Sequence, residues 1–286
     1  MKQYHDLMEK ILAYGTPKKD RTGTGTISLF AEQLRFNLQD GFPAITTKKL
    51  AWKGVVSELL WFIEGSGSER RLAEIRYGKK ANQLDDKRTI WTDNANADYW
   101  LPKAQFEGDL GRVYGVQWRA WRKPAAGVGY IDQLQQVIEN IKEKPYDRRH
   151  VVTAWNPGEI NEMALPPCHM IFQFYVADNK LSLHMMMRST DVFLGLPFNI
   201  ASYALLVHMV AQVTDLEVGE LVITCNDCHI YQNHIDAVKT QLSRSEFLLP
   251  ELLLNKDIKN IDHFTMNDIV LSNYQSHDSI RAEMAV

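Results

Sequence analysis

The chain has 286 residues, of which 45% are hydrophobic and only three are cysteine, and its formal net charge at pH 7 is −3. This length suits one large α/β domain, and the charge argues against a general nucleic-acid-binding protein, which would normally be basic. No apolar run of membrane-spanning length, no signal-like start and too few cysteines for a disulfide framework together predict a soluble protein of the reducing cytoplasm.

In the first half of the chain, apolar residues recur at helical spacing over 1–14, which predicts an opening helix that ends at Thr16-Pro17. A turn punctuated by glycines over 20–26 leads into alternating strand residues. Residues 50–63 are strongly apolar at helical spacing, so a second helix is expected there. A surface insertion is expected at about 67–90, where charges are mixed and apolar residues are few.

In the second half, residues 131–141 predict another amphipathic helix, and three short β-rich runs at 151–155, 170–176 and 181–187 predict strands. Residues 199–213 are apolar all round, which is typical of a buried central helix. Strands and helices interleave without a regular βαβ period. The sequence therefore predicts a single α/β (α+β) domain over 1–286, with helices packed on a mixed β-sheet.

Residues with useful chemistry gather around Cys168. The run 166–169 (Pro-Pro-Cys-His) places a thiol beside an imidazole, and residues 188–199 bring a cation, a hydroxyl, a carboxylate and an amide together. A lone cysteine is more often a buried small hydrophobe. Arg188, however, can lower the pKa of a nearby thiol or grip a phosphate, and the amide of Asn199 can read a pyrimidine edge. These residues predict covalent catalysis on a phosphorylated substrate that carries a base.

Glu58 and the Arg148-Arg149 pair each allow two interpretations. Glu58 is an acid within an apolar helix; it is either solvated or turned inward, where burial would raise its pKa and suit it for proton transfer. The two arginines follow an amphipathic helix, where they could cap its end or complete a phosphate clamp with Arg21 and Arg188.

The pattern C-x-x-C-H at 225–229 has the spacing of c-type haem attachment. Haem attachment occurs in exported proteins, and a zinc site would need a second pair of ligands, so neither haem nor metal is expected. His229 and Tyr231 are instead expected as alternate residues on one face of a strand or extended loop. Trp91, which ends the charged insertion, could belong to the core or form a wall on which a flat ligand stacks.

Taken together, these features resemble the thymidylate synthase family over nearly the whole chain. The motifs that carry the resemblance are 20–26, 41–43, 46–49, 58–62, 114–119, 148–149, 167–169, 191–202, 229–231 and 284–286. Such a set in one order is highly specific. The resemblance implies a homodimer formed through the sheet, with dUMP and 5,10-methylenetetrahydrofolate as substrates.

The resemblance also implies roles for single residues. Cys168 resembles the nucleophile that adds to C6 of the pyrimidine, and Glu58 resembles the group that, with ordered water, moves protons. Tyr114 and His169 match polar positions that line the same site. The implied binding residues are Arg21, Arg188 and Ser189 for phosphate, with Arg148 and Arg149 from the partner subunit, Asn199 for uracil, His229 and Tyr231 for ribose, and Asp191, Trp91 and Val286 for folate.

Several positions depart from the family pattern. Met187 stands where glutamine usually precedes Arg-Ser, Arg112 where proline is usual, Asn226 where glycine is usual, and Asp278 where proline is common. Met-Arg-Ser also resembles the sister pyrimidine hydroxymethylases, which quench the C5 methylene with water instead of hydride.

The favoured reaction is the reductive methylation of dUMP to dTMP, which oxidises the folate to dihydrofolate. The alternative is a dUMP hydroxymethylase that makes 5-hydroxymethyl-dUMP and leaves tetrahydrofolate. Trp91, Leu165 and the Ala285-Val286 tail favour the synthase, because these parts of the family's site exclude water. A binding protein without activity is disfavoured because Cys168, Glu58 and Tyr114 are all present.

Overall fold

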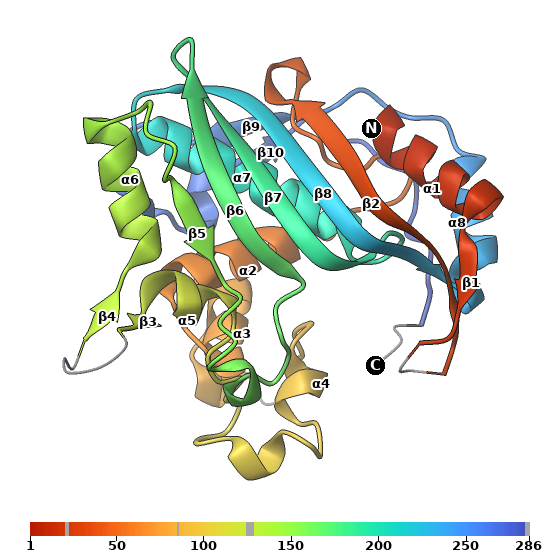
Figure 1. Ribbon diagram of the computed structural model, residues 1–286, viewed down its shortest axis with the longest axis horizontal. Coiled ribbons are helices and arrows are strands. Elements are labelled where there is room, and N and C mark those ends of the chain that lie inside the picture. The colour runs from red at the N-terminus through yellow and green to blue at the C-terminus, as the bar shows by residue number, and fades with distance from the viewer. Residues whose placement is uncertain (21–22, 85, 124–128, 284–286) are drawn as a thin grey trace.

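The computed structural model describes residues 1–20, 23–84, 86–123 and 129–283. Its centre is a six-stranded sheet in the order β1-β2-β8-β7-β6-β5 (Figure 1). In that order the strands are Thr16–Lys18, Thr26–Asn37, Glu217–Tyr231, Lys180–Asp191, His169–Ala177 and Val151–Thr153. β7 and β8 run parallel, and the other neighbouring pairs are antiparallel. The predicted mixed sheet with helices packed on it is confirmed.

Helices and two small two-stranded sheets pack at the ends of this sheet and on one of its faces (Figure 1). The helices are α1 (Lys2–Tyr14), α2 (Trp52–Glu64), α3 (Glu69–Tyr77), α4 (Thr92–Ala95), α5 (Tyr114–Arg119), α6 (Gln133–Glu143), α7 (Leu196–Val213) and α8 (Ile235–Leu242). Two small antiparallel sheets pair β3 (Trp121–Arg122) with β4 (Tyr130–Ile131) and β9 (Glu251–Leu254) with β10 (Ile269–Ser272). The helices predicted over 1–14, 50–63, 131–141 and 199–213 are confirmed to within a few residues.

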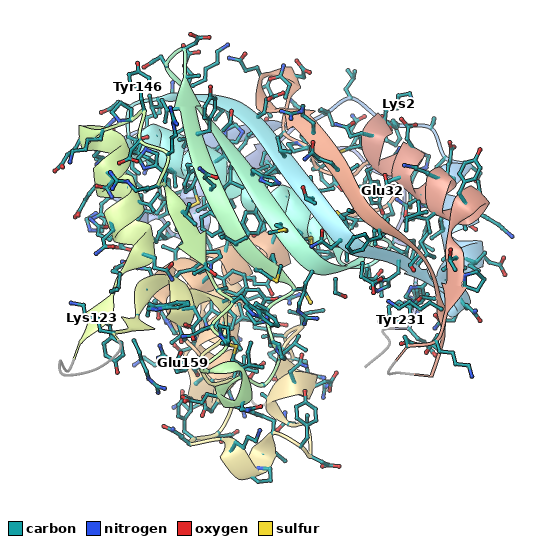
Figure 2. The ribbon with its side chains drawn as sticks, in the orientation of Figure 1. Lys2, Glu32, Lys123, Tyr146, Glu159 and Tyr231 are labelled. Carbon is teal, nitrogen blue, oxygen red and sulfur yellow. The ribbon has the colours of Figure 1, made fainter. Side chains whose placement is uncertain are left out.

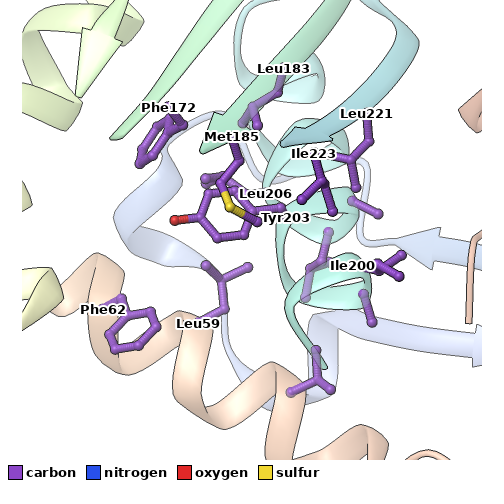
Figure 3. Packing of buried hydrophobic residues seen from close by; sticks show 14 of the residues in the cluster. Leu59, Phe62, Phe172, Leu183, Met185, Ile200, Tyr203, Leu206, Leu221 and Ile223 are labelled. Atoms are coloured by element: carbon purple, nitrogen blue, oxygen red, sulfur yellow. The ribbon is translucent and has the colours of Figure 1, made fainter. Parts of the chain in front are cut away.

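Helix α7 connects β7 to β8 and covers one face of the sheet, as expected for a crossover between parallel strands. Figure 3 shows its residues Tyr203 and Leu206 beside Met185 of β7, with Leu59 of α2 on the other side. The helix is long and apolar enough to span a membrane, so the statement that no such run exists was wrong. However, 78% of it is buried inside the protein, because it lies between the sheet and α2.

The opposite face of the sheet is more open, and in Figure 1 no helix crosses it in the described part of the chain. Along β6, Phe172 and Phe174 are buried toward α7, whereas Gln173 is exposed and Tyr175 is 64% exposed. His184 of β7 is exposed on the same open side as Gln173, its partner in the register. This alternation leaves an extended surface of mixed polarity on the sheet.

The segment at about 67–90 contributes to the packing as well as to the surface. Helix α3 packs against α2, and its Leu72 is 2% exposed. Leu84 is fully buried, and Glu69 is 4% exposed despite its charge. Composition alone did not show that these few side chains are buried among the charged residues.

Candidate active site

The topology brings four strand ends to one edge of the sheet. Because β6 and β7 are antiparallel, the start of β6 lies beside the end of β7. Because β7 and β8 are parallel, their last residues also meet, and Asp191 pairs with His229 in the register. The first residue of β2, Thr26, pairs with Tyr231. The carboxyl ends of parallel strands are a frequent place for ligand sites.

A tight hairpin brings Cys168 to Arg188. β6 and β7 are joined by Asp178 and Asn179, whose φ angles of 48° and 60° are those of a two-residue turn that follows the twist of the strands. The Arg188 amide donates to the Cys168 carbonyl at 2.8 Å. Residues twenty apart in the sequence are therefore direct neighbours in space.

The Arg188 side chain is held by the segment that carries the thiol. Its Nε and Nη2 donate to the carbonyls of Pro167 at 2.8 Å and Pro166 at 2.9 Å, and Nη2 lies 3.8 Å from Cys168 Sγ. Burial raises the pKa of the Cys168 thiol, and this outweighs the opposing effects of the Arg188 charge and of Tyr114. The expectation that Arg188 opposes thiol protonation has the right sign, but the net shift is upward because the site is enclosed.

Tyr114 holds the backbone at the thiol. Its hydroxyl accepts a hydrogen bond of 2.7 Å from the Cys168 amide. The Tyr114 ring is 3% exposed and stacks on His169 with ring centroids 4.0 Å apart. Burial raises the pKa of Tyr114 well above its ordinary value, so the phenol keeps its proton.

Glu58 lies on α2 and faces inward. Its Oε1 accepts a hydrogen bond of 2.7 Å from Trp91 Nε1. The side chain keeps partial access to solvent, yet burial of the carboxyl raises its pKa to about 7, against the lowering effect of the Trp91 hydrogen bond. Of the two interpretations of Glu58, the inward one is confirmed. A carboxyl with this pKa can both take and give a proton near neutral pH.

The loop that carries Trp91 is fixed by Glu69, which the sequence did not single out. Glu69 Oε1 accepts hydrogen bonds from the hydroxyls of Thr89 at 2.7 Å and Thr92 at 2.6 Å, the residues that flank Trp91 on either side. Trp91 itself is 6% exposed, and its ring lies 5.8 Å from that of Tyr114. In the sequence Glu69 is one acid among many charged residues, and nothing local marks it as buried.

The start of α7 and the end of β7 carry polar groups that remain available. Asp191 Oδ1 accepts from the amides of Phe193 and Leu194, both at 3.0 Å, which orients the carboxylate. Asn199 lies in the first turns of α7 and is partly exposed. Among the described residues, the side-chain amide of Asn199 and the hydroxyl of Ser189 have no hydrogen-bond partner, so both can bind a ligand.

His229 and Tyr231 lie on β8, as expected for alternate residues of one strand, and their ring centroids are 5.1 Å apart. His229 Nδ1 is 3.2 Å from the Asp227 carbonyl. Cys225 and Cys228 of the same strand are fully buried. Within the described ranges no group of three or more metal-binding side chains occurs.

Arg148 and Arg149 are not part of this cluster within one chain. Both are exposed, and Arg149 forms a two-pronged ion pair with Asp147. Gln173 donates to the Arg148 carbonyl, five residues along β6 from Cys168. At about 3.3 Å per residue, the backbone of β6 beside the pair lies roughly 16 Å from that of Cys168. Arg21 and Val286 lie outside the described residues.

Met187 and Arg112, two of the positions that depart from the family pattern, each have well-defined neighbours in the structure. Met187 is 2% exposed and pairs with His169 on one side and Cys225 on the other. Arg112 donates to Glu159 at 2.6 Å, and Gln117 donates to the same oxygen at 2.7 Å. Sequence reasoning missed Glu159, because nothing local marks its run as buried.

One comparison with known proteins decides the family. The family model described as thymidylate synthase matches residues 2–286. The chain belongs to the thymidylate synthase family. The match covers the described cluster and the whole sheet, which agrees with the resemblance inferred from the motifs.

Proposed function

We propose that this protein is a thymidylate synthase that converts dUMP to dTMP with 5,10-methylenetetrahydrofolate as donor of the carbon and the hydride. The observation that carries the proposal is the joint placement of a guanidinium 3.8 Å from the Cys168 thiol and of a phenol on the Cys168 amide. Adding a thiolate to C6 of a pyrimidine needs a fixed nucleophile beside a cation.

In this proposal each group has a defined task. Cys168 attacks C6, which makes C5 nucleophilic toward the methylene carbon that the folate supplies. Glu58, with a pKa of about 7, moves protons near neutral pH. Arg188 keeps Nη1 without a hydrogen-bond partner among the described residues, and with Ser189 it would bind the phosphate. His229 and Tyr231 would bind the ribose.

The pterin would lie between Trp91 and the side of the site formed by Asp191. Trp91 presents an aromatic ring that is already fixed by Glu58, and the Asp191 carboxylate is oriented by two amides. An aromatic face and an oriented carboxylate are suited to a flat heterocycle that carries N–H donors. Val286 is proposed to complete this side. No metal or haem is proposed, and the cytoplasm is the proposed setting.

The second candidate is dUMP hydroxymethylation, favoured by Met187 in place of the usual glutamine. Met187 is buried, so an apolar side chain stands next to Arg188 where the family usually has a polar one. The test is incubation with dUMP and methylenetetrahydrofolate, followed by absorbance and product mass. Dihydrofolate with a methylated product supports the synthase. A hydroxymethyl product without dihydrofolate would contradict the synthase and support the hydroxymethylase. The absence of turnover would contradict both candidates.

Asn199 is proposed to select uracil. Its amide can donate to O4 and accept from N3–H, whereas cytosine reverses both demands and leaves buried groups unpaired at about 1–3 kcal/mol each. Asn199→Asp is expected to shift preference toward dCMP, as measured by the ratio of kcat/KM values. Equal turnover of dCMP and dUMP by the unaltered protein would contradict this assignment.

A homodimer formed through the open face of the sheet is also proposed, with Arg148 and Arg149 reaching the partner's phosphate site. Their distance from the thiol of their own chain and the exposure of Tyr175 support this arrangement. The test mixes inactive Cys168→Ser with Arg148→Ala/Arg149→Ala. A mixed dimer contains one site with intact thiol and intact arginines, so activity is expected to return. Continued inactivity in demonstrated heterodimers would place the arginines in their own subunit's site.

A further inference from the structure

A buried phenol on the central helix meets the histidine beside the thiol. Tyr203 of α7 is 2% exposed, and its Oη lies 2.8 Å from His169 Nδ1. Figure 3 shows the hydroxyl pointing away from α7 into the space between Phe62 and Phe172. The rings of Tyr203 and His169 are perpendicular, with centroids 5.3 Å apart. Tyr203 was not among the residues singled out from the sequence.

The direction of this hydrogen bond follows from the chemistry of the two groups. Burial lowers the pKa of His169 to about 3 and raises that of Tyr203 well above its ordinary value, so both are neutral at pH 7. A neutral imidazole has one donor and one acceptor nitrogen. Among the described residues, the Tyr203 hydroxyl has no second partner. If it accepted from His169, its own proton would be buried without an acceptor, which is costly.

The less costly arrangement has the Tyr203 O–H donating to Nδ1. The imidazole proton then resides on Nε2, the ring nitrogen that makes no hydrogen bond to the described protein. The ring is held in place, because it stacks on Tyr114 at 4.0 Å and packs near Phe62 at 5.9 Å. His169 keeps 7% exposure, so Nε2 can meet a ligand or an ordered water.

We infer that Tyr203 is a positioning residue that fixes His169 as a hydrogen-bond donor at Nε2 and so favours a carbonyl oxygen over an amino group on the bound base. This inference rests on the proposed function for the identity of the base. The tautomer itself is a property of the protein alone.

The first arm of the test measures the tautomer without any substrate. ¹⁵N shifts of histidine-labelled protein, assigned with His169→Gln, are expected to show Nε2 protonated and Nδ1 as an acceptor. Tyr203→Phe is expected to change the shift of Nδ1 and to bring in the second tautomer. Tyr4→Phe is the matched control, since Tyr4 is also fully buried and its hydroxyl donates to the Val192 carbonyl at 2.9 Å. Protonated Nδ1 in the unaltered protein, or unchanged shifts in Tyr203→Phe, would overturn the inference.

The second arm measures selection. In Tyr203→Phe the ratio of kcat/KM for dUMP over dCMP is expected to fall about 3- to 10-fold, the usual effect of one neutral hydrogen bond. Tyr4→Phe is expected to leave this ratio unchanged. An unchanged ratio in Tyr203→Phe would overturn the role in selection. If the unaltered protein turned over neither nucleotide, the proposed function would fail, while the first arm would still decide the tautomer.

Discussion

Two buried carboxyls in this domain, Glu58 and Glu159, have opposite surroundings. Glu58 has a neutral hydrogen-bond donor, Trp91, and burial raises its pKa to about 7. The Glu159 side chain is 5% exposed, and burial opposes its ionisation too. Hydrogen bonds from Arg112 and Gln117 and the charge of Arg122 nevertheless lower the pKa of Glu159.

The difference shows what separates a group suited to proton transfer from a group that holds the fold. A carboxyl with neutral partners can change its charge near pH 7, whereas one enclosed by guanidinium groups stays ionised. Glu159 links the segment that precedes Cys168 to the segment that precedes α5, through its hydrogen bond with Arg112. The Arg112 amide strengthens this link, because it donates to the Glu162 carbonyl at 2.9 Å. These hydrogen bonds therefore help to position Tyr114, two residues after Arg112.

Removing the nucleophile should have the largest effect on turnover. Cys168→Ser is expected to lower kcat by about a thousandfold or more, because a serine hydroxyl lacks the thiolate population needed for attack. Steady-state kinetics measure the loss, and calorimetric titration with dUMP should show that the nucleotide still binds. Cys225→Ala is the control, since that cysteine is buried in β8 and has no assigned role. Activity of Cys168→Ser within tenfold of the unaltered protein would remove Cys168 from the mechanism.

Glu58→Gln should lower kcat by about a hundredfold, as expected when a proton-transfer group is lost. Its effect on stability has the opposite sign. Because the folded pKa of about 7 exceeds the ordinary 4.5, the unaltered protein loses up to about 3 kcal/mol of stability as pH rises between these values. Thermal unfolding from pH 5 to 8 should therefore increasingly favour Glu58→Gln. Glu64→Gln, on the exposed side of α2, should show neither effect, and a constant stability difference across pH would contradict the shifted pKa.

Trp91→Phe should have a smaller effect, since it keeps an aromatic ring but removes the donor to Glu58. The Trp91 hydrogen bond lowers the pKa of Glu58, so its loss should raise that pKa. The part of the kcat–pH profile that reports the ionisation of Glu58 should then move to higher pH, by about one pH unit at most. Trp100→Phe is the control, because its indole donates to the Asp109 carbonyl at 2.6 Å, away from Glu58. A shift of that part of the profile to lower pH would show that the indole does not stabilise the carboxylate.

Glu159→Gln should change turnover least, within about fivefold for the folded protein, while lowering stability. Breaking a buried ion pair leaves Arg112 uncompensated, at a cost of about 3–5 kcal/mol. The pKa of Glu159 is lower in the folded protein than in the unfolded chain. The ion pair of Glu159 with Arg112 therefore stabilises the fold at pH values above the unfolded pKa, and this stabilisation is lost as the pH falls through the folded pKa. Chemical denaturation at pH 7 and at acid pH measures both. Glu162→Gln, with a partly exposed side chain, should cost at most about 1 kcal/mol; an equal cost for the two variants would refute the distinction.

Local patterns were sufficient to predict the four longest helices of the described residues and a candidate covalent site, but not α3, α4, α5 or α8. Helical spacing placed α1, α2, α6 and α7, and the run of Cys168 with the Arg188 to Asn199 segment indicated a covalent site. Strand β8 was recognised only at its end, because its apolar residues are interrupted by glycine, asparagine and aspartate. The buried residues Leu72 and Leu84 in 67–90 were missed for a related reason. A few apolar side chains among many charged ones do not form a recognisable periodic pattern.

The sequence by itself determined the family and the inventory of reactive groups, since these depend on residue types and their order along the chain. Only the tertiary structure decided that Glu58 meets Trp91, that Glu159 meets Arg112 and that Tyr203 meets His169. Each of these pairs joins segments that lie 33 to 47 residues apart. Burial, pKa and hydrogen-bond direction depend on such partners, and packing brings them together in ways that no local period records.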